Sequence, residues 1–352
     1  MERVKLGGSE VEVSAICLGT MTYSNQTPPA DAHAQIDRAL AAGITFMDCA
    51  EMYPVNPVRP DTVGRSEEII GEWIAARRPG AGVQIATKIT GPSPNVRDGR
   101  PYDGATVTAC IEASLRRLRV DVIDLYQLHW PVRGSYHFRQ SWTYDPSGQD
   151  RAATLAHMED VLTALEAARA AGKIRAAGLS NESAWGLTRW IDMAGRIDAP
   201  RMAAIQNEYS VLNRAYDTDL AEVAVNEGVT LLSYSPLAAG LLTGKYQDGA
   251  LPPGSRAAVD KAHGGPGILG GRKTERSVAA TGRWLALCHD HGWDPVHLAI
   301  AWQLTRPFPV VPIIGATTDA QLAHLLDGFG RVPDADTLAA ITRFHRDTAQ
   351  SY

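Results

Sequence analysis

Short apolar runs alternate with segments of helical spacing along the whole chain, and this alternation restricts the fold more than any other feature. Runs such as 83–88 and 122–128 have the length of strands that are buried in a parallel sheet. Strict alternation of strand and helix predicts a parallel sheet with right-handed crossovers. Eight units predict a closed (β/α)8 TIM barrel, with a doubly wound open sheet as the alternative. The GxGxxG fingerprint of such open sheets is absent, because Gly7, Gly8 and Gly19 do not form it.

The spacing of apolar residues also predicts where each strand and helix lies. Strands are expected at 15–18, 44–48, 83–88, 122–128, 176–179, 202–205, 229–232 and 310–314. Helices are expected at 31–42, 66–76, 102–118, 154–171, 183–194, 216–227, 274–291, 294–305, 318–326 and 334–345. A glycine turn between 4–6 and 11–13 predicts an N-terminal β-hairpin, and Asp31 and Ser66 are expected as helix N-caps. We expect a single domain over residues 1–352, with extra helices at its C-terminal end.

Composition excludes several classes of function. The length of 352 residues suits one α/β barrel, which needs roughly 250 residues plus insertions. The net charge is −5 without a basic run, so nucleic acid is not an expected partner. The four cysteines are scattered without zinc spacing, so we expect free thiols and no metal site. The N-terminus lacks the apolar core of a signal peptide and no stretch reaches membrane-spanning length, so we expect a cytoplasmic protein without membrane partners.

Three neighbouring strands are followed by ionisable side chains at the edge where barrels carry their chemistry. Asp48, Lys88 and His129 end the second, third and fourth strands, and Tyr53 follows the first of these. Adjacent strands lie about 4.8 Å apart, so the four side chains can converge. A free tyrosine has a pKa of about 10, and a nearby ammonium group lowers it. The set therefore predicts a site that protonates a developing alkoxide, as carbonyl reduction requires.

The residues around this set resemble the aldo-keto reductase family. The segment 43–53 is similar to the family's first signature, and the resemblance runs from Val4 to about Leu326. Further segments that are similar to family motifs are 64–67, 85–88, 128–129, 178–181, 205–207 and 234–237. The segments 50–54, 128–131 and 242–246 are most similar to the bacterial Tas-like subgroup and, more distantly, to potassium-channel β subunits.

The resemblance implies a role for each of these positions. Tyr53 would be the general acid, Asp48 and Lys88 would tune its acidity, and His129 would orient the substrate carbonyl. The family uses a nicotinamide cofactor, mostly NADPH. The implied cofactor-binding residues are Gly19, Thr20, Met21, Asp48, Ser180, Asn181, Gln206, Tyr234, Ser235, Pro236, Leu237, Gly240, Leu242, Lys245, Arg256, Gly315, Thr317 and Gln321.

One position departs from the family pattern. The last barrel helix of the related subgroups carries Gln-Leu-x-x-Asn, whereas this chain has Gln321-Leu322-Ala323-His324-Leu325. Leu325 cannot make the hydrogen bond to adenine that the asparagine is expected to make. One such bond is worth about 1 kcal/mol, so the usual adenine contacts are in doubt while the chemistry is not.

Two functions remain open from the sequence. The first is NADPH-dependent reduction of an aldehyde, ketone or sugar-type carbonyl, and the reverse alcohol oxidation. The second is an NADPH-binding redox sensor subunit with little turnover. A barrel lyase or isomerase without cofactor would need a phosphate-binding glycine loop or a metal cluster, and neither is expected. The sequence leaves the substrate and a possible homo-oligomer open.

Three long connections, 54–64, 131–153 and 237–273, leave the expected catalytic edge. Tyr23, Tyr53, His129 and Trp130 are expected to contact substrate. The segment 131–153 also carries Tyr136, His137, Phe138, Trp142 and Tyr144. This segment fits no strand or helix period and predicts either a wall of the substrate pocket or a surface excursion.

Overall fold

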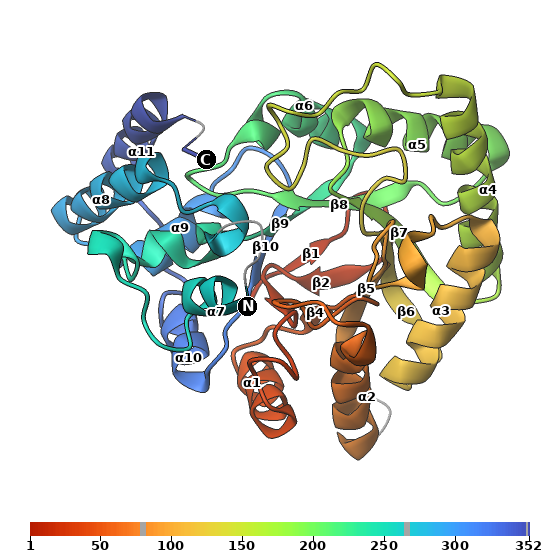
Figure 1. Ribbon diagram of the computed structural model, residues 1–352, viewed down its shortest axis with the longest axis horizontal. Helices are drawn as coiled ribbons and strands as arrows, with labels where there is room; N and C mark the ends of the chain where they lie inside the picture. The colour runs from red at the N-terminus through yellow and green to blue at the C-terminus, as the bar shows by residue number, and fades with distance from the viewer. Residues whose placement is uncertain (78–81, 264–267, 350) are drawn as a thin grey trace.

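Eight parallel strands close into a barrel in the order β10-β3-β4-β5-β6-β7-β8-β9 (Figure 1). The computed structural model describes residues 1–77, 82–263, 268–349 and 351–352. The barrel strands are β3 (Cys17–Gly19), β4 (Phe46–Asp48), β5 (Gln84–Ile89), β6 (Ile123–Leu128), β7 (Ile174–Ser180), β8 (Met202–Glu208), β9 (Thr230–Tyr234) and β10 (Val310–Ile314). The predicted (β/α)8 barrel is therefore confirmed, and the open sheet is excluded.

Helices cover the outside of the barrel (Figure 1). They are α1 (Pro29–Ala41), α2 (Arg65–Arg77), α3 (Gly104–Leu118), α4 (Arg151–Ala170), α5 (Ala184–Ile197), α6 (Asp219–Glu227), α7 (Arg256–His263), α8 (Glu275–Asp290), α9 (Pro295–Gln303), α10 (Asp319–Asp327) and α11 (Ala335–Thr348). The extra helices α8 and α11 lie side by side, joined by an ion pair of 2.8 Å between Arg283 and Asp347. Among the described residues, no helix has both the length and the apolar character that a bilayer crossing requires.

The predicted N-terminal hairpin closes one end of the barrel. It consists of β1 (Arg3–Lys5) and β2 (Glu12–Ser14), which pair in antiparallel fashion. One buried cluster joins Leu6, Val11 and Val13 of the hairpin to Cys17, Phe46, Leu125 and Leu232 of the strands. The amide of Gly7 also donates to Thr230 Oγ1, 2.8 Å away at the start of β9. The amino ends of the strands are thus filled by packing, which leaves the carboxyl ends for chemistry.

Both predicted N-caps are wrong. Helix α1 begins at Pro29, and Asp31 lies in its first turn, because proline already fixes the backbone angle that the first helical position needs. Helix α2 begins at Arg65, and the Ser66 hydroxyl instead donates to the Tyr23 carbonyl at 3.1 Å. Ser66 therefore joins α2 to the segment after β3 rather than starting the helix.

Two further differences concern the carboxyl ends of the strands. Strand β8 continues three residues beyond the predicted 202–205, so that Gln206 and Glu208 lie within the strand. The connection 237–273 contains helix α7, which the sequence did not predict, and its residues 264–267 lie outside the described part of the chain.

The segment 131–150 lies over the ends of β7 and β8. Ser135 Oγ donates to the carbonyl of Asn181 at 2.9 Å, and the His137 ring lies 3.2 Å from the carbonyl of Glu182. Phe138 contacts Trp130 edge to face at 5.8 Å between ring centroids. Trp142, in contrast, is 75% exposed. The first part of the segment thus borders the carboxyl end of the barrel, whereas Trp142 points into solvent.

The packing of α2 on α3 depends on a glycine. A Cβ atom at Gly71 would lie 2.1 Å from the carbonyl oxygen of Arg117, which is backbone and cannot move aside. We predict that Gly71→Ala lowers the free energy of unfolding by about 1–3 kcal/mol, measured by urea denaturation. Gly195→Ala is the matched control, because α5 leaves open space there, and it should raise stability by about 0.5–1 kcal/mol. Equal effects of the two changes would contradict the proposed close contact.

Candidate active site

A buried ion pair lies at the carboxyl ends of β4 and β5. Lys88 Nζ lies 2.7 Å from Asp48 Oδ2, and the two side chains are 0% and 3% exposed. The same ammonium group donates to the carbonyl of Cys49 at 2.7 Å. Burial alone lowers the pKa of Lys88, but the charge and hydrogen bond of Asp48, together with Tyr53 and Cys49, outweigh burial and raise the pKa above the usual lysine value. Lys88 is therefore charged at neutral pH.

Two buried amides hold the other oxygen of Asp48. Gln206 Nε2 donates to Asp48 Oδ1 at 2.8 Å, and Gln127 Nε2 donates to it at 3.2 Å. With Lys88 on the second oxygen, the carboxylate is fixed on both sides. Sequence reasoning missed Gln127, although a polar residue within the apolar run of β6 is a signal for a buried polar contact.

Tyr53 lies next to this ion pair. Its hydroxyl oxygen is 3.4 Å from Lys88 Nζ, and the ammonium group also lies 4.7 Å from the ring centroid. Burial raises the pKa of Tyr53 to about 12, while Lys88 works in the lowering direction. The expectation of a net lowered pKa is therefore not met, because Tyr53 is only 8% exposed. The tyrosine is protonated at neutral pH and can donate.

His129 completes the group. Its ring lies edge to face with that of Tyr53, at 5.8 Å between centroids and 75° between planes. Burial and the neighbouring Lys88 charge hold its pKa well below the usual histidine value, so the imidazole is neutral. Its Nδ1 atom is buried and has no hydrogen-bond partner among the described residues. The structure thus brings the three predicted strand-end residues and Tyr53 together.

The polar residues at the ends of β7, β8 and β9 form one network. Asn181 donates through its side-chain amide to the carbonyl of His129 at 2.9 Å and accepts from the Tyr234 hydroxyl at 2.8 Å. Ser180 Oγ donates to the carbonyl of Gln206 at 2.8 Å. Four of the expected nicotinamide contacts therefore lie within one connected patch beside Asp48.

The residues after β3 are divided between this patch and the core. Gly19 pairs with Asp48, and Thr20 Oγ1 donates to the carbonyl of Asp48 at 2.9 Å. Met21 is half-buried beside them. Tyr23, in contrast, is 0% exposed and belongs to the apolar core, so it offers no surface to a substrate in this structure. Trp130 is half-buried, with its ring 4.9 Å from that of His129.

The chain after β9 turns back over the edge of the barrel. Ser235, Ala238, Ala239 and Gly240 all have positive φ angles. Pro236 and Leu242 are buried, whereas Leu237 is half-buried. A Cβ atom at Gly240 would lie 3.4 Å from Lys245 Nζ, so the lysine lies against this turn. Burial lowers the pKa of Lys245, and among the described residues it forms no ion pair.

Arg256 extends the positive charge of this edge. Burial, with the nearby charge of Arg272, lowers the pKa of Arg256 to about 10. Its Nε atom is buried and has no hydrogen-bond partner among the described residues. Sequence reasoning missed Arg272, which pairs with Glu208 at 2.6 and 2.8 Å, and Arg139, which lies 3.9 Å from the same carboxylate. Such pairs between distant segments leave no local signal.

The start of α10 is exposed. Thr317 donates from both its amide and its hydroxyl to Gln321 Oε1, each at 3.0 Å, and Gly315 precedes them on the surface. Leu325 is 5% exposed and belongs to the apolar core. The departure from the family pattern is therefore accommodated by packing.

Comparison with known proteins agrees with this arrangement. Residues 15–346 match the model of the Aldo/keto reductase family. The chain belongs to this family. The aldo/keto reductase is similar to Protein tas of Escherichia coli, with 40% identity over 353 residues that cover 98% of each chain. It is also similar to a probable voltage-gated potassium channel subunit beta of Arabidopsis thaliana, at 29% identity over 95% of this chain and 92% of the relative. A 6-dehydroglucose reductase of Novosphingobium aromaticivorans is 28% identical over 91% of this chain and 88% of the relative.

The contributions of Asp48 and Lys88 to the free energy of unfolding should depend on each other. Removing one partner of a buried pair leaves an uncompensated charge, so we predict that Asp48→Asn destabilises this aldo/keto reductase by about 3–5 kcal/mol. Lys88→Met should also destabilise it, whereas the double variant should lose at least about 1 kcal/mol less than the sum. Urea denaturation of the four proteins measures the coupling. Additive losses would show that the two charges do not depend on each other.

Proposed function

We propose that the protein catalyses NADPH-dependent reduction of an aldehyde, ketone or sugar-type carbonyl, with Tyr53 as the general acid. The observation that carries the proposal is the position of the Tyr53 hydroxyl, 3.4 Å from an ammonium group that Asp48 holds in a buried ion pair. A protonated phenol beside a fixed positive charge is suited to give up its proton to an alkoxide, because the charge stabilises the phenolate that remains.

The residues divide the work of this step. Tyr53 transfers its hydroxyl proton to the carbonyl oxygen as negative charge develops there. Lys88 stabilises the phenolate, and Asp48 keeps Lys88 in place rather than taking the proton. His129 is neutral and lies beside Tyr53, so a ring N–H is available to donate to the same oxygen and orient it. Water or a later proton donor then restores Tyr53.

The edge of the barrel fits an anionic dinucleotide. Positive φ angles at Ser235, Ala238, Ala239 and Gly240 fold the chain into a tight turn at this edge, where Gly240 lets the Lys245 ammonium group lie close to the backbone. Lys245 and Arg256 add positive charge, and among the described residues neither forms an ion pair, although Asp260 lies near Arg256. Ser235, Leu237, Gly240 and Leu242 would line the pyrophosphate, and Gly315, Thr317 and Gln321 would hold the adenosine end.

The patch formed by Ser180, Asn181, Gln206 and Tyr234 would hold and orient the nicotinamide, with Gly19, Thr20 and Met21 beside its ribose. NADPH, when bound, supplies the hydride that adds to the carbonyl carbon. The hydrogen bonds that Asn181 makes to His129 and Tyr234 connect this patch to the residue whose ring lies beside the proposed acid. One hydrogen-bond network would therefore hold both the cofactor and the substrate.

Aromatic side chains lie near the proposed acid, which suits an apolar or sugar-ring substrate. Trp130 and the segment from Ser135 to Arg139 border this edge of the barrel. The relative from Novosphingobium is named a 6-dehydroglucose reductase, which supports a sugar-type carbonyl as one candidate class. We propose that the first part of the segment 131–150 forms one wall of the substrate pocket.

A second candidate function is redox sensing. The Arabidopsis relative is named a probable potassium channel subunit, and it covers nearly the whole chain. NADPH absorbance followed with a panel of aldehydes, ketones and oxidised sugars separates the two functions. Steady turnover supports the reductase, whereas a single oxidation of bound cofactor supports the sensor.

The role of Tyr53 leads to a direct prediction. Tyr53→Phe removes the proposed acid and should lower turnover by at least about 10²-fold, while cofactor binding measured by fluorescence stays nearly unchanged. Tyr126→Phe is the matched control, because this hydroxyl is equally buried but has no hydrogen-bond partner among the described residues. Its turnover should stay near that of the unmodified protein. Normal turnover of Tyr53→Phe would remove Tyr53 from the mechanism.

Cofactor preference provides an independent prediction. Lys245 and Arg256 should favour NADPH over NADH by roughly ten- to a hundredfold, the effect of one charge-assisted hydrogen bond. Lys245→Met and Arg256→Gln should each reduce this ratio. Lys173→Met is the control, because Lys173 pairs with Glu112 just before β7, at the opposite end of the barrel. Equal affinity of the unmodified protein for both cofactors would refute the phosphate assignment.

A further inference from the structure

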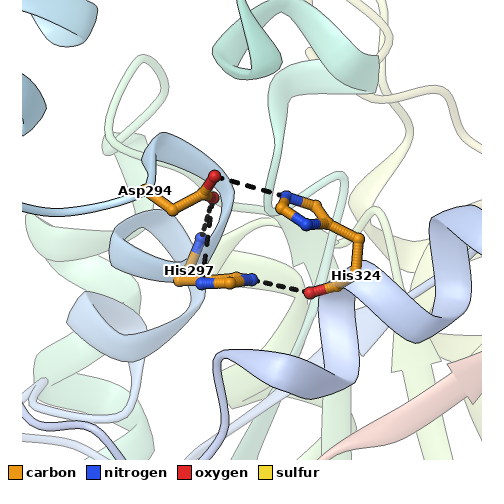
Figure 2. A group of neighbouring side chains, drawn as sticks. All are labelled: Asp294, His297 and His324. Atoms are coloured by element: carbon orange, nitrogen blue, oxygen red, sulfur yellow. Dashed lines mark hydrogen bonds and ion pairs between the residues drawn. The ribbon is translucent and has the colours of Figure 1, made fainter.

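Three potential metal ligands converge on the outer surface, between helices α9 and α10. They are Asp294, His297 and His324, and one ligand atom from each lies within 4.8 Å of the others (Figure 2). Asp294 and His297 flank the first turn of α9, and His324 comes from α10. The group is separate from the proposed active site and has no role in the proposed chemistry.

The structure fixes how Asp294 and His297 present their ligand atoms. His297 Nε2 lies 2.6 Å from the carbonyl oxygen of His324, and because a carbonyl can only accept, Nε2 carries the hydrogen. The lone pair of the neutral ring is then on Nδ1, which faces Asp294 Oδ1 at 4.0 Å (Figure 2). A backbone carbonyl that holds the second nitrogen of a histidine is the usual support of a metal-binding imidazole.

Asp294 is held by the start of α9. Its Oδ1 atom accepts from the amides of Val296 at 2.8 Å and His297 at 3.1 Å. Its Oδ2 atom lies 3.3 Å from His324 Nε2. The carboxylate therefore presents one oxygen toward each histidine, and only the side chain of His324, which is 49% exposed, has much freedom to adjust.

The separations suit a tetrahedral ion. Zinc bonds of about 2.0–2.2 Å to nitrogen and oxygen place neighbouring ligand atoms roughly 3.4 Å apart. Asp294 Oδ2 lies 3.3 Å from His324 Nε2, which is close to this value, and one ligand atom from each of the three residues lies within 4.8 Å of the others. Two imidazoles with one carboxylate favour zinc and similar transition metals, whereas magnesium and calcium prefer oxygen ligands.

We propose that Asp294, His297 and His324 form a binding site for a divalent transition-metal ion of the zinc type. The three side chains supply three ligands, and water supplies the fourth. The ion would link α9 to α10, the two helices on either side of β10 in the chain. The alternative is an N-cap aspartate that simply pairs with a neighbouring histidine.

Titration of the full-length protein, free of affinity tag and metal, with Zn²⁺ alone tests the proposal by calorimetry. We expect one ion per chain, no binding of Mg²⁺ at this position, and a rise in the unfolding temperature with Zn²⁺. His324→Ala should weaken Zn²⁺ binding by at least about tenfold, since even loss of a supporting contact costs that much. Asp294→Asn keeps a good N-cap while removing the anionic ligand, so it should weaken binding without unfolding α9.

His289→Ala is the matched control. His289 also lies beside an aspartate on the surface, with its Nδ1 atom 3.4 Å from Asp290, but it has no third ligand in the described structure. This variant should bind Zn²⁺ like the unmodified protein. The proposal fails if the unmodified protein shows no stoichiometric binding. It also fails if His324→Ala and His289→Ala bind Zn²⁺ equally well.

Discussion

The buried ion pair between Lys88 and Asp48 is the interaction on which the proposed site depends. Two opposite charges taken out of water are stable only if their geometry is good and their remaining hydrogen bonds are satisfied. Here the ammonium group also donates to a backbone carbonyl, and two glutamine amides occupy the second oxygen of the carboxylate. Strands β4, β5, β6 and β8 each contribute one of these side chains. The pair is therefore fixed by the closure of the barrel itself.

This fixed charge determines what its neighbours can do. It holds the pKa of His129 down together with burial, which keeps the imidazole neutral. It works against the effect of burial on Tyr53, whose pKa nevertheless rises to about 12. A tyrosine that stays protonated until a substrate oxygen becomes basic is a suitable acid for the proposed reduction.

Much of this arrangement could be predicted from the sequence because its signals are local. Strand β10 was placed at its observed bounds, since an apolar run that ends at glycine is informative by itself. Asp48, Lys88 and His129 were placed at strand ends by the same argument. The prediction of Asp31 as the N-cap is wrong, because the preference of Pro29 for the first helical position outweighs the preference of a nearby aspartate for the N-cap.

Contacts between distant segments could not be predicted in this way. Arg272 and Glu208 are 64 positions apart and meet only because the barrel closes. The Asp294, His297 and His324 group joins residues i and i+3 of one helix to a third ligand from the next helix, which is not a recognised zinc spacing. The net effect on the pKa of Tyr53 also required the structure, because it depends on how deeply the ring is buried.

The local charge at the edge of the barrel is positive, opposite in sign to the net charge of the whole chain. The protein carries a net charge of −5, yet Arg139, Arg256 and Arg272 lie near a single buried carboxylate, that of Glu208. Arg272 donates two short hydrogen bonds to that carboxylate. Burial raises the pKa of Glu208, but Arg272, Tyr352 and Arg139 together outweigh burial, so that the pKa is lowered. Arg139 lies 3.9 Å from the same carboxylate, and Arg256, with Asp260 nearby, forms no ion pair among the described residues. Burial lowers the pKa of each of these two arginines. Concentrated positive charge in a half-buried place is unfavourable by itself, and an anionic ligand would relieve it. This imbalance supports the proposal that the phosphates of a dinucleotide bind at this edge, beside the network that leads to Tyr53.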